Sequence, residues 1–142
     1  GQKEKSFAAQ AQTIRKDFLK LIQRDEYEFK RLVAIYGDPS QKNVYQNRLR
    51  NCARVPQSIC ERIVNSLELA QRQIGRTGGW LVSDLKEAAL ILEAAFYSSR
   101  LNVEVNLKEM DDEEFKNLAR RNLSKLEKDM GRRVTLLKKA VR

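Results

Sequence analysis

Apolar residues recur at alternating spacings of three and four along the first quarter of the chain, from about Lys3 to Tyr36. This period predicts one long amphipathic helix with a single apolar stripe. Asp25 interrupts the stripe, because it occupies the seam position between Leu21 and Phe29. The residues that follow, Gly37-Asp38-Pro39-Ser40, are typical of a helix end and a turn.

A second helical pattern runs from about Gln41 to Ile74, and Val55-Pro56 predicts a kink or a break, with the proline in the first turn of a new helix. After a Gly-rich loop, an apolar helix is expected from about Leu85 to Val105. Asp84 and Glu87 have the three-residue spacing of a capping box at its start. Because apolar residues cover almost every side of this helix, we expect it to lie at the centre of a bundle.

The run Asp111-Asp112-Glu113-Glu114 predicts the start of a last helix, because acidic side chains are favoured at the positive end of a helix dipole. A short strand over 102–106 is an alternative, since polar and apolar residues alternate there. No alternating run is long enough to make a sheet. The expected fold class is therefore all-α: one domain over residues 1–142, a bundle of long helices that pairs with a second copy of itself.

The 142 residues are 42% hydrophobic and 33% charged, a balance typical of a globular domain. No apolar run is long enough to span a membrane, and no apolar signal segment opens the sequence, so we expect a cytoplasmic protein. The chain lacks His, which excludes imidazole catalysis and most zinc sites, and no metal site is predicted. Cys52 and Cys60 are expected to be buried free thiols.

The net charge of +9 is concentrated near the C-terminus, where Lys116 to Arg142 contain ten basic and two acidic residues. This excess suits an anionic partner or else forms a solvated helix face. The segment lacks the interleaved aromatic residues and base-reading motifs of nucleic-acid-binding proteins. Binding of nucleic acid through this helix, by a dimer without catalytic activity, is the alternative function.

Four polar residues are candidates for a functional site. Asp25, in an apolar seam, is either the ion-pair partner of a neighbouring helix or a functional acid. Asp84 is either a helix cap or a proton-transfer group on the rim of a pocket. Asn102 and Asn106, one helical turn apart, either bridge backbone groups or line a site.

These elements, taken together in chain order, resemble the formiminotetrahydrofolate cyclodeaminase and methenyltetrahydrofolate cyclohydrolase family. Their order and spacing agree from Asp25 to Phe115, although Glu28 stands where the family usually has Ala. The resembling pieces are Asp25-Glu26-Tyr27-Glu28-Phe29, Ala53-Arg54-Val55-Pro56, Ser83-Asp84 before an Ala-rich helix, Asn102-Val103-Glu104-Val105-Asn106-Leu107 and Asp111-Asp112-Glu113-Glu114-Phe115.

The resemblance implies an all-α homodimer that acts on a tetrahydrofolate derivative as substrate, without a prosthetic group, a metal or a membrane. The reaction is either closure of 5-formiminotetrahydrofolate to the 5,10-methenyl form with loss of ammonia, or hydrolysis of that form to 10-formyltetrahydrofolate. It implies catalytic roles for Asp84 and Asp25, in proton transfer or in stabilising the iminium charge. Ser83, Asn102 and Asn106 would bind the substrate, and basic side chains would hold its glutamate tail.

Two features depart from the family's pattern. Members usually begin with a Gly-rich segment and a helix, whereas this sequence begins at Gly1-Gln2 without them and without Met. The loop before Ser83 usually carries a Gly-Asn pair, whereas here it reads Thr77-Gly78-Gly79-Trp80. We therefore expect either an N-terminally truncated piece of an active enzyme or a relative that kept the fold and lost the catalysis.

Overall fold

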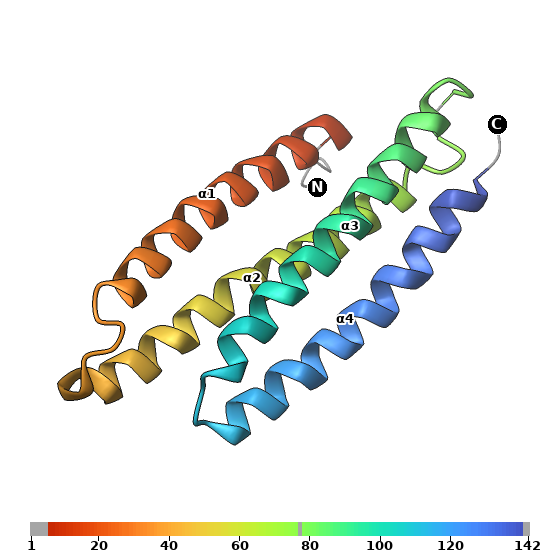
Figure 1. Ribbon diagram of the computed structural model, residues 1–142. Helices are drawn as coiled ribbons and strands as arrows, with labels where there is room; N and C mark the ends of the chain where they lie inside the picture. Colours follow the sequence, from red (N-terminus) through yellow and green to blue (C-terminus); the bar gives the residue numbers. More distant parts are fainter. Residues whose placement is uncertain (1–5, 77, 141–142) are drawn as a thin grey trace, which may run out of the picture.

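The computed structural model describes residues 6–76 and 78–140, and these form four long helices and one short 3₁₀ helix. The elements are α1 (Phe7–Val33), η1 (Pro39–Gln41), α2 (Lys42–Gln71), α3 (Leu81–Lys108) and α4 (Glu113–Lys139). Consecutive long helices run antiparallel, so the start of α1 and the end of α4 lie at the same end of the molecule (Figure 1). The all-α prediction is confirmed, and the strand alternative for 102–106 is wrong because that segment belongs to α3.

The ends of α1 follow from local capping. The Ser6 hydroxyl accepts a hydrogen bond from the Ala9 amide at 3.2 Å, which satisfies one of the free N–H groups of the first turn. The helix ends at Val33, and the chain then turns at Gly37, whose φ of +77° favours glycine. The predicted stop is confirmed, three residues earlier than the pattern indicated, whereas the predicted start at Lys3 lies outside the described residues.

α2 runs without a break through Pro56, so the prediction of a new helix starting there was wrong. A proline inside a helix removes the N–H that would bind the carbonyl four residues earlier, which here belongs to Cys52. The side-chain amide of Asn106, on α3, donates a hydrogen bond to that carbonyl at 3.4 Å. A neighbouring helix therefore supplies the donor that the proline lacks.

The central helix of the bundle is α2, which packs against α1, α3 and α4. The prediction that the apolar segment from Leu85 to Val105 forms the centre is wrong within a single chain. One side of α3 is open to solvent, and its large apolar residues there have exposed fractions above one half: Leu90 52%, Ile91 69%, Leu101 67% and Val105 62%. Its all-round apolar pattern thus includes a face that this chain alone does not cover.

The predicted capping box at the start of α3 was also wrong. The helix begins at Leu81, and its N-cap residue, Trp80, provides no side-chain cap hydrogen bond. Asp84 lies exposed within the first turn, while the Ser83 hydroxyl donates a hydrogen bond to the carbonyl of Trp80 at 2.8 Å. A carboxylate in the first turn still interacts favourably with the positive end of the helix dipole.

α4 starts where the acidic run predicted. Asp112 is its N-cap residue, and its carboxylate accepts a hydrogen bond from the Phe115 amide at 2.9 Å. This hydrogen bond, followed by one from the Arg50 side chain, lowers the pKa of Asp112. Three ion pairs then join α4 to α3 along its length: Arg120–Glu104, Arg100–Glu127 and Lys138–Glu93.

The hydrophobic core lies along α2 and is formed by side chains of all four long helices. Cys52 and Cys60 are both buried and free, as predicted. Over the described ranges 6–76 and 78–140, none of the helices is long and apolar enough to cross a lipid bilayer. Fully buried large side chains include Leu49, Ile63, Leu67, Phe96, Leu107, Leu123, Met130 and Leu137.

Candidate functional site

A cavity of about 200 Å³ between α1, α2 and α3 brings together three of the predicted site residues: Asp25, Asn102 and Asn106. Asp25 reaches it from α1, and the two asparagines reach it from α3, where a spacing of four places them on one face. The lining is completed by Phe29, Cys52 and Val105. One carboxylate and two amides thus face the same cavity.

Asp25 is the titratable group of this cavity. Its side chain is partly buried, and it makes no hydrogen bond or ion pair with any residue in the part of the chain that the structure describes. Burial therefore raises the pKa of the Asp25 carboxyl above its ordinary value. A carboxylate with free oxygens can accept a proton from a substrate and return it, and the raised pKa makes this carboxylate a stronger proton acceptor than an exposed one.

The two asparagines differ in what they contact. The Asn106 side chain donates hydrogen bonds to two backbone carbonyls, that of Asn102 at 2.8 Å and that of Cys52 at 3.4 Å. Asn106 therefore bridges backbone groups of two helices, as one of the two alternatives predicted. The Asn102 side chain is exposed and has no hydrogen-bond partner within the described residues, so its amide is available to a ligand.

The Cys52 thiol forms an inert part of the wall. Burial, followed by the negative charges of Glu28 and Asp25, raises its pKa to about 11. The thiol is thus protonated at neutral pH, and the thiolate is the form that acts as a nucleophile. The site's chemistry rests on the carboxylate and the amides rather than on sulfur.

Glu28 is a buried carboxylate that our sequence analysis recorded only as a departure from the family's Ala. It lies one turn beyond Asp25 on α1 and is 5% exposed. The Asn51 side chain donates a hydrogen bond to it at 3.4 Å, and the Arg31 guanidinium lies 3.7 Å from it. The periodicity contained the signal, because Glu28 is seven residues after Leu21 and four before Leu32, on the inward side of the helix.

Ser83 and Asp84 do not reach this cavity within one chain. Asp84 precedes Asn102 by 18 residues on α3, which corresponds to five turns and roughly 27 Å along the axis. The two residues therefore share one side of the helix but lie near its opposite ends. Within a single chain the structure joins Asp25 with the asparagines and leaves Ser83 and Asp84 apart.

The fold and the cavity define a class of protein: an all-helical bundle with a carboxylate and amide pocket between its antiparallel helices. A sequence pattern described as formiminotransferase-cyclodeaminase matches residues 2–125. The chain belongs to the formiminotransferase-cyclodeaminase family, as the ordered motifs indicated.

The chain is also similar to two proteins whose names describe a cyclodeaminase. It is 35% identical over 82 residues to the formimidoyltransferase-cyclodeaminase of Rattus norvegicus, a stretch that covers 57% of this chain and 15% of the rat protein. It also resembles the crystal structure of formiminotetrahydrofolate cyclodeaminase from Thermotoga maritima, with a TM-score of 0.86 and 24% identity. That superposition covers 92% of this chain and 65% of the bacterial one, so the chain spans less than two thirds of either relative.

Proposed function

We propose that this chain contributes to folate one-carbon metabolism by binding a tetrahydrofolate derivative in the cavity between α1, α2 and α3. The proposal rests on one observation above all: the unpaired Asp25 carboxyl, with its raised pKa, faces the same cavity as the Asn102 amide. The names of the two relatives, both cyclodeaminases, support the class of reaction.

Ring closure of 5-formiminotetrahydrofolate needs two proton movements and no redox chemistry. N10 attacks the formimino carbon and loses its proton. The formimino nitrogen gains two protons, one from water and one that came from N10, and leaves as ammonia. Asp25 would accept the first proton and return one to the leaving nitrogen. As a carboxylate it would also stabilise the positive charge of the 5,10-methenyl product. Asn102 would orient the substrate by hydrogen bonds.

A dimer is part of this proposal. The open side of α3 exposes a row of apolar residues, and burying it against a second copy would remove that surface from water. A shared role of Asp84 and Asp25 in one site also requires a second copy, because roughly 27 Å separates Asp84 from the cavity along α3. The substrate-binding role of Ser83 depends on the same arrangement.

The direct test is release of ammonia from 5-formiminotetrahydrofolate by the purified chain, compared with Asp25→Asn and with Arg15→Gln. Arg15 is exposed on α1 and lies away from the cavity, so it is a matched control. We expect ammonia release in the wild type and in Arg15→Gln, and a loss of roughly 100-fold or more in Asp25→Asn, the range for a general acid–base group. Equal rates in all three proteins would contradict the proposed role of Asp25.

The nucleic-acid alternative rests on the outer side of α4. Three of its basic residues, Arg121, Lys125 and Lys128, are exposed and have no acidic partner within the described residues. Phosphate contacts of this kind release counterions, so binding of duplex DNA would fall steeply with salt. Salt-sensitive DNA binding without folate binding would favour this alternative over the enzyme.

A further inference from the structure

One side of α3 carries a regular row of side chains that the rest of the chain leaves uncovered. The positions follow one another at alternating spacings of three and four, so they lie on one side of the helix. All of them are exposed, and the charged side chains among them make no ion pair or hydrogen bond within residues 6–76 and 78–140. We call this row the α3 stripe: Asp84, Glu87, Ile91, Ala94, Ser98, Leu101, Val105 and Lys108.

The order of residue types within the α3 stripe fits an antiparallel pair of identical helices. Its middle, at Ala94 and Ser98, is small and allows two helices to approach closely. When Ala94 of one copy packs on the partner's Ser98, Asp84 faces the partner's Lys108, because both lie ten residues from this central pair. In a parallel pair each charge would face its own copy, and like charges repel. Charge complementarity therefore favours a second copy of this chain in the antiparallel direction.

The same register places a carboxylate of the partner beside the Asp25 cavity. Val105 belongs both to the α3 stripe and to the lining of this cavity. The residue that faces Val105 is the partner's Glu87, because both lie seven residues from the central pair. The partner's Asp84, one turn further, reaches the same end of α3, as a shared site with Asp25 requires.

We propose that two copies of the chain pair through the α3 stripe in this antiparallel register and that the partner's Glu87 completes the Asp25 cavity. Glu87 adds a second carboxylate to a site whose lining contains Asp25 and no basic residue. Two carboxylates in one site favour a ligand with N–H donors and a positive charge, both of which a protonated formimino derivative of tetrahydrofolate has. The binding role of Glu87 rests on the proposed function, whereas the pairing of the helices rests on the α3 stripe alone.

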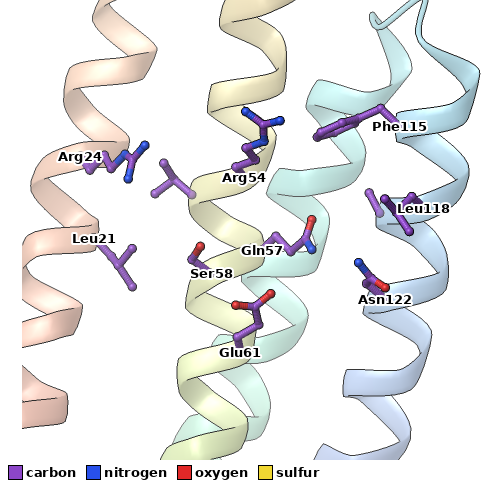
Figure 2. Close-up of a pocket in the computed structure, with 11 residues that line it drawn as sticks. Leu21, Arg24, Arg54, Gln57, Ser58, Glu61, Phe115, Leu118 and Asn122 are labelled. Atoms are coloured by element: carbon purple, nitrogen blue, oxygen red, sulfur yellow. The ribbon is translucent and has the colours of Figure 1, made fainter.

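A matched control position lies on another side of the bundle. A cavity of about 400 Å³ has all its lining residues on α1, α2 and α4, and α3 lies behind α2 in the view from that side (Figure 2). A second copy on α3 therefore leaves this cavity open. Leu118, on its α4 wall, is 49% exposed, which makes it comparable to the apolar residues of the α3 stripe.

Disulfide trapping tests the register, and the native thiols of Cys52 and Cys60 are buried. In the double variant Glu87→Cys/Val105→Cys each new thiol faces a new thiol of the partner, so mild oxidation should give a covalent dimer on a non-reducing gel. Each single variant should give none, because this register separates identical residues of the two copies by roughly 27 Å along the axis. The two new thiols of one chain are equally far apart and cannot join each other.

Leu118→Cys should likewise give no covalent dimer. Cross-links in either single variant, or none in the double variant, would overturn the proposal. Glu87 and Val105 are exposed in one chain, so neither substitution removes a core contact.

Mixed dimers test the role of Glu87 in the site. Glu87→Gln should weaken binding of 5-formyltetrahydrofolate roughly tenfold, as Asp25→Asn should, since each removes a charge-assisted hydrogen bond. When these two variants are unfolded and refolded together, about half of the dimers are mixed, and one site in each joins an intact Asp25 to an intact Glu87. About a quarter of all sites should therefore regain wild-type affinity. Unchanged affinity of Glu87→Gln, or no recovery in the mixture, would overturn the role of Glu87.

Failure of the proposed function would give a different result. Covalent dimers of the double variant, together with no folate binding by the wild type, would contradict the folate proposal and still confirm that the partner's Glu87 lies beside the Asp25 cavity.

Discussion

The Asn106 side chain stands in for the backbone N–H that Pro56 lacks. Its Nδ2 donates to the carbonyl of Cys52 across the α2–α3 interface at 3.4 Å. That carbonyl is the one that a non-proline residue at position 56 would bind within the helix. The relationship explains both why α2 continues through a proline and why a polar amide is tolerated between two apolar helices.

A double-mutant cycle tests this relationship. Asn106→Ala should destabilise the wild type by about 1–3 kcal/mol, because a part-buried carbonyl loses its donor. In a Pro56→Ala background the new N–H would satisfy the same carbonyl, so the Asn106→Ala substitution should cost about 1 kcal/mol less. Urea unfolding of the wild type, the two single variants and the double variant gives the coupling free energy between Pro56 and Asn106. Additive effects would mean that the two residues act independently.

The pH dependence of stability tests the environment of Asp25. Because burial raises the pKa of Asp25 in the folded state, folded protein binds this proton more tightly than the unfolded chain does. The carboxyl therefore lowers stability as the pH rises from its ordinary value of 3.8 through the raised value. Asp25→Asn removes this effect, so the variant should melt at a higher temperature than the wild type at neutral pH. Below pH 3.8 the difference between the two melting temperatures should be smaller. A gain that is the same at both pH values would contradict a raised pKa.

A higher melting temperature of Asp25→Asn would also show whether Asp25 is retained for catalysis or for packing. A substitution that stabilises the fold while it abolishes ammonia release marks a residue retained for chemistry. A substitution that lowers both would mark Asp25 as a packing residue.

The thiols should be inert in the folded protein. Burial raises the pKa of Cys52 to about 11 and that of Cys60 to about 12. Because thiol–disulfide exchange requires the thiolate, a disulfide reagent at pH 8 should react with neither until the chain unfolds. The measurement is absorbance after addition of the reagent, with and without denaturant. Rapid reaction of one thiol under native conditions would show that its helix opens locally.

The open side of α3 predicts the oligomeric state. Leu101→Lys places a charge at the middle of the exposed apolar row and should convert a dimer into a monomer, as measured by light scattering. Leu136→Lys is the matched control, because Leu136 is a half-exposed leucine on α4 and does not belong to this row. A monomeric wild type, or dissociation of both variants alike, would exclude this row as the dimer contact.

The sequence predicted the helices well where their signals were local. The turn at Gly37 and the Asp112 cap depend on neighbouring residues, and each was found at its predicted place. The predicted α1 stripe was wrong at Phe29, which is 61% exposed, because Glu28 takes the inward position there. The prediction failed at Pro56, because the compensating donor comes from Asn106, 50 residues further along the chain. It failed at Asp84 because α3 starts one turn earlier, at Leu81, with no side-chain cap to mark the start.

The candidate site was predicted in part for the same reason. Asp25 was recognisable because a carboxylate in an apolar stripe is locally anomalous, and the spacing of Asn102 and Asn106 placed them on one face. The meeting of these three side chains in one cavity depends on how α1 and α3 lie against α2, which local periodicity does not determine.

The central claim is that a tetrahydrofolate derivative binds in the Asp25 cavity, and calorimetric titration with 5-formyltetrahydrofolate tests it most directly. The account predicts saturable binding that Asp25→Asn weakens roughly tenfold, as expected for loss of a charge-assisted hydrogen bond, and that Arg15→Gln leaves unchanged. Equal affinity of the wild type and Asp25→Asn, or no binding by either, would contradict it.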